Sequence, residues 1–374
     1  MKFRDMPYER VDYDRAKEEI LRLTQKVKDA ENPEELWAVH QEYYRVYKGV
    51  ADAMTIAHIR HDADVTDEFY NGEQDYYDEI GPKLSNLLTG YQRAIFESPC
   101  RPFLEEKIGK VAFVSIENAM KSVDESIIGL MQAENALTTE YNKLIASAQI
   151  PFDGQVLNLS LMRPYLTASD RSVRRAAWKA YSDYFLTVAE KLDEIYDRLV
   201  KNRTAQAKAL GYENYIQLGY YRMNRNSYGR KDVENFRRQV KEVFVPFAEE
   251  VHEKRRTRLG LPKLSYIDNE VYFPDGNPAP VGTPEEILKT GQHMYGELSE
   301  ETKEFFDFMM ENELFDVFGR KTKKQGGYMT YLYNYGSPFI FANFNGTSGD
   351  VDVITHECGH AFQGYLSGRD PILE

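Results

Sequence analysis

Two histidines and a glutamate near residue 360 have the types and the spacing of a metal site. The stretch DVITHECGHAFQGYL places His356 and His360 four residues apart, with Glu357 directly after the first histidine. On an α-helix, residues four apart lie on one face, so both imidazoles can converge on one zinc ion. Glu357 is rotated by about 100°, so it can act as general base toward a water whose pKa zinc has lowered. The alternative is a solvated helical turn, because short patterns of this kind also arise by chance.

The residues after the motif narrow the choice of a third metal ligand. A metzincin would need a glycine three residues after His360 and a histidine six residues after it, but those positions hold Gln363 and Leu366. The remaining option is a glutamate, which would leave an open water position on the metal. Asp370 and Glu374 are the only carboxylates after His360, and both are too near the motif to swing back easily.

The composition argues against a nucleic-acid-binding or membrane protein. The 374 residues carry a net charge of −13, whereas nucleic-acid binding depends on Lys and Arg that neutralise phosphates. Two short basic runs, 254–258 and 321–324, are interpreted as solvated faces. No apolar run has the length of a signal peptide or a transmembrane helix. Cys100 and Cys358 are too few for a disulfide framework, so we expect reduced thiols and a soluble, cytoplasmic protein.

Helical periodicity dominates the first part of the chain, residues 12–147. Start signals occur at Asn32, which precedes a proline, and at Asp67, which follows a threonine. The stretch 111–147 is expected to form one long helix. Helices of such length suit a layered helical body better than a small compact bundle.

The pattern changes at an Asp-Gly pair beginning at residue 153, which predicts a β-hairpin within 148–166. Helical character returns at residues 169–170, with Asp170 or Ser172 as the expected N-cap of a long helix. We therefore expect a boundary there, with an N-terminal helical lobe at 1–168 that ends in the hairpin and a second domain at 169–374.

The second domain is expected to hold further helices and a small sheet. Residues 264–282 indicate a strand followed by a loop, and Thr283 caps the first of the helices that run to about Phe318. Aromatic and β-branched residues within 326–345 predict two short strands leading into the metal-site helix. Three residues before that helix either orient substrate or a ligand histidine, or only form the strand-to-helix turn: Asn343, Gly346 and Thr347.

A second group of possible metal ligands lies near residue 60. His58 and His61 are three residues apart, and Asp62 and Asp64 follow them. This spacing brings two imidazoles together on a helix, but the carboxylates fall at the expected helix end. We favour a structural role for this group.

The sequence resembles oligoendopeptidase F, within the thimet-oligopeptidase-like zinc peptidases and nearest to the kind called Pz-peptidase. The resemblance rests on four stretches: the HExxH helix, SPFIFANFNGTSGDVDVITHECGHAFQGYL, GGYMTYLYNYG and RHDADVTDEFY. It implies a mainly α, long-helix, two-lobed body around a deep channel, with a small β-sheet next to the HExxH helix. It also implies that the strand at 337–345 pairs with substrate backbone, which makes Phe341, Ala342 and Asn343 candidate substrate-binding residues.

The resemblance implies a zinc endopeptidase that cleaves internal bonds of short, unstructured oligopeptides, with His356 and His360 as ligands and Glu357 as general base. In that family the third ligand is a glutamate about two dozen residues after the second histidine, a position beyond residue 374. We therefore expect a truncated form that lacks the third ligand and the oxyanion donors. The competing hypothesis is a non-catalytic helical fragment that binds extended peptides. The oligomeric state is left open.

Overall fold

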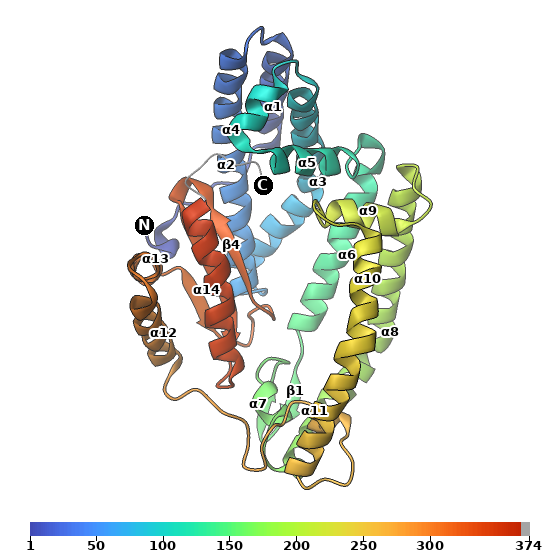
Figure 1. The fold of residues 1–374 in the computed structure, drawn as a ribbon, viewed down its shortest axis with the longest axis vertical. Helices are drawn as coiled ribbons and strands as arrows, with labels where there is room; N and C mark the ends of the chain where they lie inside the picture. The colour runs from blue at the N-terminus through green and yellow to red at the C-terminus, as the bar shows by residue number, and fades with distance from the viewer. Residues whose placement is uncertain (368–374) are drawn as a thin grey trace.

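The N-terminal part of the computed structural model, which describes residues 1–367, is a lobe of long helices (Figure 1). Two of its predicted helix starts are confirmed. The Asn32 side chain accepts a hydrogen bond from the Glu35 amide, and the Asp67 side chain accepts one from the Tyr70 amide. Its elements are η1 (Phe3–Asp5), α1 (Tyr13–Asp29), α2 (Pro33–Ala63), α3 (Glu68–Glu97), α4 (Arg101–Ile108) and α5 (Lys110–Met120).

A second wall of helices, on the right in Figure 1, descends from this lobe. The predicted hairpin is present as β1 (Ile150–Phe152) and β2 (Gln155–Leu157), and its turn residues Asp153 and Gly154 have φ values of 51° and 70°. Asp170 caps the next helix as expected, accepting from the Ser172 amide. The helices of this wall are η2 (Glu125–Ile127), α6 (Ile128–Ala146), α7 (Arg163–Leu166), α8 (Arg171–Ala209), α9 (Tyr215–Arg222), α10 (Arg230–Gln239), the π-helical η3 (Val240–Phe244) and α11 (Val245–Arg258).

The C-terminal part forms the opposite wall around a three-stranded sheet. The strand order is β3-β5-β4, in which β5 is parallel to β3 and antiparallel to β4. Thr283 caps α12 with a reciprocal bond from Glu286, as the sequence predicts. The elements are η4 (Tyr266–Asp268), α12 (Pro284–Leu298), α13 (Glu300–Glu311), β3 (Phe315–Phe318), β4 (Tyr328–Leu332), η5 (Tyr333–Tyr335), β5 (Ser337–Phe344) and α14 (Gly349–Ser367).

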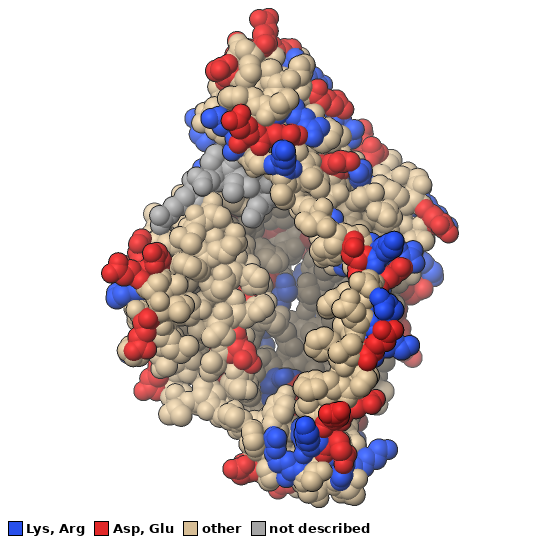
Figure 2. Space-filling model, viewed as in Figure 1, with Lys and Arg blue, Asp and Glu red and all other residues tan. Residues whose placement is uncertain are grey.

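The sheet is covered on both faces. On one face α14 packs against β4, where a Cβ added at Gly364 would lie 3.3 Å from the Tyr331 ring. On the other face α2 packs against β4, with the His58 and Tyr328 rings 5.9 Å apart. Between the wall that contains α14 and the wall that contains α8 and α10, the molecular surface is deeply hollowed (Figure 2). The mainly helical fold with a small sheet beside the HExxH helix is therefore as predicted.

Three expected elements are wrong in detail. Residues 111–147 form two helices, α5 and α6, because the chain turns at Lys121 and Ser122. Residues 264–282 contain the short helix η4 and no strand. Phe315–Phe318 is strand β3 and not the end of a helix, since its pairing partner β5 lies more than twenty residues later and leaves no local signal.

His40 makes the N-terminal lobe sensitive to mild acid. Its ring is fully buried beside Tyr43 and Tyr91, with Nδ1 3.3 Å from the Tyr91 hydroxyl. Burial lowers the pKa of His40 to about 4. The folded state holds this ring neutral. The contribution of His40 to the free energy of unfolding is therefore fully present above the ordinary histidine pKa of about 6.5 and is lost as the pH falls toward 4.

We predict a loss of about 2 kcal/mol from this residue between pH 7 and pH 5, measured as the shift of the urea unfolding midpoint. His40→Phe removes the titrating group and should flatten that part of the pH profile. His293→Phe, at an exposed position on α12, serves as control and should leave the profile unchanged. Equal acid sensitivity of wild type and His40→Phe would contradict this account.

Candidate metal centre

The helical period of α14 decides which of its side chains face outward. Ile354, Cys358, Ala361 and Tyr365 recur every three or four residues and are all buried. They pack on α12, α13 and the sheet; for example, the Tyr365 and Phe305 rings are 5.6 Å apart. This packing fixes the rotation of the helix about its axis.

His356 and His360 lie on the opposite face of α14 and are exposed, whereas Glu357 is half-buried at its edge. The Nε2 atoms of the two histidines are 3.3 Å apart, and their rings are inclined by 81°. Two nitrogens bound at 2.0–2.1 Å to a tetrahedral zinc would lie about 3.3 Å apart. The structure therefore brings the two predicted ligands together at a separation that suits one zinc ion.

The third ligand is not found in the described part of the chain. Among residues 1–367, no group of three or more His, Cys, Asp or Glu side chains could hold a metal ion. Asp370 and Glu374 lie outside the described residues. Cys358, although inside the motif, is on the buried face, and burial raises the pKa of its thiol to about 12. It is therefore a neutral core residue that does not face the histidines.

The carboxylate of Asp350 fixes the turn between β5 and α14, a role that the sequence did not predict. Both oxygens of the buried Asp350 accept backbone hydrogen bonds, from Asn345 at 3.0 Å and from Gly346 at 2.8 Å. Gly346 has a φ of 81°, which favours glycine. The Thr347 hydroxyl closes the turn on the Asn345 side chain at 2.7 Å. Of the two roles considered for Gly346 and Thr347, the structure shows the turn.

The predicted pairing of substrate with residues 337–345 is wrong for this sheet. β5 is the central strand, so both of its edges are already bonded to neighbours. Phe341 and Ala342 are fully buried, and the Asn343 amide donates to the carbonyls of Lys324 and Gly326. Within the described residues, the free edges of this sheet belong to β3 and β4.

The basic run at 321–324 is not simply a solvated face. Lys323 is buried, and its ammonium group donates to Asp316 Oδ1 at 2.9 Å and to the Phe318 carbonyl at 3.2 Å, and also to the Ala342 carbonyl. Burial lowers the pKa of Lys323 to about 8. These bonds tie β3 to β5 where their register shifts, between Asp316 and Phe318. A lysine among other lysines carries no sequence signal for such a role.

The group near residue 60 joins the lobe to the sheet and does not form a metal site. The buried Asp62 is 2.9 Å from the Lys324 ammonium, and it also contacts His58 and His61 at 3.2 Å. A lysine at this carboxylate takes the place that a cation would need. The Lys324 amide also donates to the Asp62 carbonyl at 2.8 Å. The structural role that we favoured for this group is therefore the one observed.

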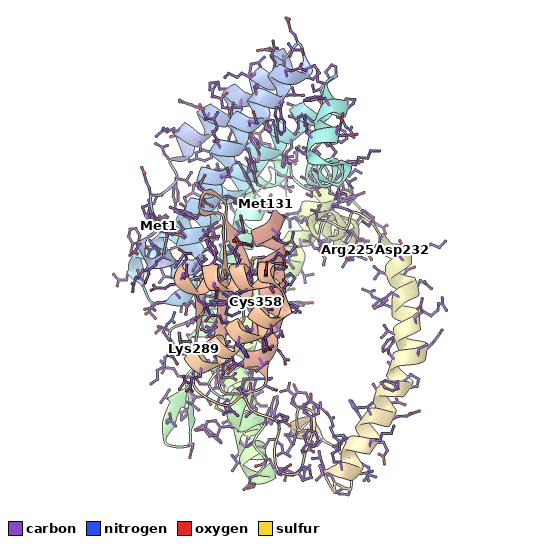
Figure 3. All side chains as sticks on the ribbon, turned by 60° about the vertical axis from the view of Figure 1, so that its left-hand side comes forward. Met1, Met131, Arg225, Asp232, Lys289 and Cys358 are labelled. Carbon is purple, nitrogen blue, oxygen red and sulfur yellow. The ribbon has the colours of Figure 1, made fainter. Side chains whose placement is uncertain are left out.

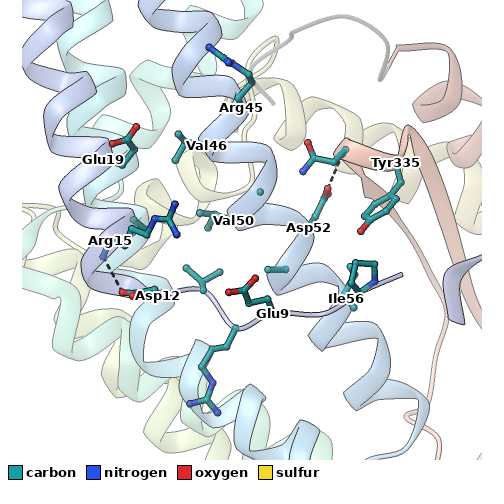
Figure 4. Close-up of a pocket in the computed structure, with 17 residues that line it drawn as sticks. Glu9, Asp12, Arg15, Glu19, Arg45, Val46, Val50, Asp52, Ile56 and Tyr335 are labelled. Carbon is teal, nitrogen blue, oxygen red and sulfur yellow. Dashed lines mark hydrogen bonds between the residues drawn. The ribbon is translucent and has the colours of Figure 1, made fainter. Parts of the chain in front are cut away.

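A cavity of about 590 Å³ lies elsewhere, between α1, α2 and η5 (Figure 4). It has an apolar floor that includes Val46 and Val50, and its rim carries charges of both signs, among them Arg15 and Glu9. None of the three motif residues lines it. A second cavity, of about 430 Å³, includes residues 346–349 and Asp352 at the start of α14. This second cavity lies beside the N-terminal end of α14, the helix that carries the two histidines.

Known proteins are similar to this chain in fold and in sequence. The chain is similar to Pz peptidase A, solved with an inhibitor, with 44% identity and a TM-score of 0.98 over 99% of this chain and 66% of that one. It is 24% identical to oligopeptidase PepF of Bacillus subtilis and 21% identical to an oligoendopeptidase F homolog of Borreliella burgdorferi, each over 87% of this chain. The chain spans 50% and 57% of the length of these two relatives.

Two family descriptions match the sequence in separate regions. The Peptidase M3 N-terminal domain matches residues 3–123, within the helical lobe and its neighbouring helices. Peptidase family M3 matches residues 165–371, a region that includes the sheet and both motif histidines. With more than half of its length matched, the chain belongs to peptidase family M3.

Proposed function

We propose that this chain carries the zinc-binding and general-base residues of an endopeptidase that cleaves internal bonds of short, unstructured oligopeptides. The observation that carries the proposal is the 3.3 Å separation of His356 Nε2 and His360 Nε2 on the exposed face of α14. A buried opposite face holds that helix in place. Membership of peptidase family M3 supports the same chemistry.

His356 and His360 would hold the zinc ion, and Glu357 would act as the base. Zinc, when bound, lowers the pKa of its water and polarises a substrate carbonyl. Glu357 follows the first ligand and lies at the edge of the same face, where its carboxylate can reach a water beside the two imidazoles. It would accept a proton as that water attacks the peptide carbonyl and deliver the proton to the leaving amine.

Substrate selection would depend on the hollow and on an edge strand. Figure 2 shows a hollow between the two walls, and we propose that it admits an extended peptide and excludes a folded protein. β4 is an edge strand beside α14, since Gly364, one turn after His360, packs on Tyr331. We therefore assign backbone pairing with the peptide to β4 in place of β5.

A second candidate function is peptide binding without catalysis. It is favoured by the absence of a third metal ligand among residues 1–367.

Because the chain spans about half the length of its curated relatives, we propose that the third ligand comes from polypeptide outside the described residues.

We also propose a cytoplasmic location. Both cysteines are free thiols, as is usual in a reducing compartment. No helix in the described part of the chain combines the length and apolar composition that crossing a bilayer requires.

Zinc titration tests the metal site independently of activity. We expect one weak zinc site per chain, removed by exhaustive dialysis because only two protein ligands are present among residues 1–367. His356→Ala or His360→Ala should weaken zinc binding at least about 100-fold, since loss of a supporting residue alone costs about 10–100-fold. His293→Ala, at an exposed histidine of α12, is the matched control. Undiminished binding in both motif variants would disprove the site.

Glu357→Gln separates catalysis from metal binding. We expect zinc affinity to be retained and zinc-dependent cleavage of a quenched internal peptide to fall about 10²–10⁴-fold, the usual contribution of a general base. Glu297→Gln, which makes the same change at an exposed position of α12, should leave cleavage unchanged. Cleavage at the wild-type rate in Glu357→Gln would refute the assigned role. Peptide binding with no cleavage by the wild type would favour the second candidate function.

A further inference from the structure

The cavity between α1, α2 and η5 is separate from the candidate metal centre. Its volume of about 590 Å³ is within the range of sites that hold small molecules, about 300–1,000 Å³. None of the residues that line it belongs to α14. In Figure 3 the blue helices of the N-terminal lobe extend above α14, which is labelled at Cys358. A molecule bound in this cavity would therefore leave the histidine pair uncovered.

Two charged side chains at this cavity have no partner in the described chain. Arg15, on α1, extends toward Val50 in Figure 4, and the Glu9 carboxylate points into the same space. Among residues 1–367, neither side chain forms an ion pair or a hydrogen bond. Two other charged residues of the rim are already paired: Arg10 with Glu73 and Glu19 with Arg22. The cavity therefore keeps one cation and one anion available for a ligand.

The wall beside η5 carries a nearly buried carboxylate. Asp52 is 4% exposed, and its oxygens accept hydrogen bonds from the backbone amides of Tyr333 and Asn334. No basic side chain among residues 1–367 forms an ion pair with it. Burial raises the pKa of Asp52, and a buried charge in a protein is usually paired. A positively charged group on a ligand would therefore stabilise this carboxylate.

These features match a zwitterion with an apolar body. Arg15 presents a planar guanidinium, which can bind a carboxylate through two parallel hydrogen bonds. Asp52 and Glu9 would attract an ammonium group. In Figure 4, Val50 lies between Arg15 and Asp52. The apolar floor, which includes Val46 and Val50, favours an aliphatic side chain on the ligand, because burying apolar surface is favourable.

We propose that this cavity binds an amino acid or a dipeptide with an aliphatic side chain, with Arg15 at its carboxylate and Glu9 and Asp52 at its ammonium group. Amino acids and dipeptides share this chemistry, and their relative affinities distinguish them. Both belong to the class of molecules that hydrolysis of oligopeptides yields. The site is nevertheless independent of the proposed peptidase chemistry, because it shares no residue with the HExxH motif.

Calorimetric titration of the 374-residue chain with leucyl-leucine tests the proposal. We expect one site per chain. Amidation of the ligand's carboxylate or acetylation of its amine should each weaken binding about ten-fold or more, as expected when a hydrogen bond to a charged group is lost. Free leucine is titrated in parallel. Binding of leucine as tightly as leucyl-leucine would assign the site to amino acids, and weaker binding would assign it to dipeptides.

Variants of the two unpaired residues test which group of the ligand each one contacts. Arg15→Gln should weaken binding of leucyl-leucine about ten-fold and leave binding of its amide unchanged. Glu9→Gln should weaken binding of leucyl-leucine and leave binding of its N-acetyl form unchanged. Lys17→Gln and Glu18→Gln are the matched controls, because they make the same changes at exposed positions of α1 that do not line the cavity.

Filling the cavity provides a second test. Gly49, on α2, lines the cavity, and a Cβ added there has no atom of the described chain within 4 Å. Gly49→Leu should therefore abolish binding while the fold is kept. Gly72→Leu, at a glycine of α3 that is equally open but lies outside the cavity, should bind as the wild type does.

Two outcomes would overturn the proposal. One is that neither leucine nor leucyl-leucine binds to the wild-type chain. The other is that leucyl-leucine binds at wild-type strength to both Gly49→Leu and Arg15→Gln, which would place the ligand elsewhere. None of these titrations uses zinc or peptide cleavage, so a failure of the proposed function would leave their results unchanged.

Discussion

The burial of one face of α14 is the constraint on which the candidate site depends. Four side chains of this face are buried between the sheet on one side and α12 and α13 on the other: Ile354, Cys358, Ala361 and Tyr365. A rotation of the helix by one residue would expose part of this set and change which side of the helix carries His356 and His360. The apolar packing thus sets the direction in which the two imidazoles point.

Polar bonds then connect this packed unit to the N-terminal lobe. Asp52 on α2 accepts from the amides of Tyr333 and Asn334 at 2.6 and 2.8 Å. Asp62, ten residues later on the same helix, pairs with Lys324. Each of these carboxylates is nearly or fully buried. Removing one partner from such a pair leaves a buried group unsatisfied, which costs more than the bond itself contributes. The lobe and the sheet are therefore bonded to each other, and α14 packs on the sheet.

Local signals in the sequence were sufficient for much of the fold and for the motif. Caps at Asn32, Asp67 and Asp170 act between neighbours in the chain, and so does the turn at Asp153. The four-residue spacing of His356 and His360 needs only a helix to bring the imidazoles together. What could not be predicted depends on distant partners. β3 is a strand only because β5 lies beside it, and the burial of Lys323 depends on carbonyls from two strands.

The order of the strands could not be predicted either, because it depends on pairing between distant segments. It is the reason that we assign the contact with substrate backbone to β4 and not to β5. The apolar run around Phe341 indicates a strand, but only the sheet shows that this strand is central. A run that is buried on both faces and paired on both edges is typical of a core strand. The edge strand next to α14 is β4.

The position of Cys358 also bears on the chemical durability of the motif. Oxidation of a cysteine requires the thiolate and access for the oxidant. Cys358 has neither, because its side chain is fully buried and its thiol pKa is raised to about 12. A sulfur atom placed between Glu357 and His360 in the sequence is thereby protected from peroxide and from thiol exchange. The histidine pair can pass through an oxidising environment without the helix that carries it being modified at its centre.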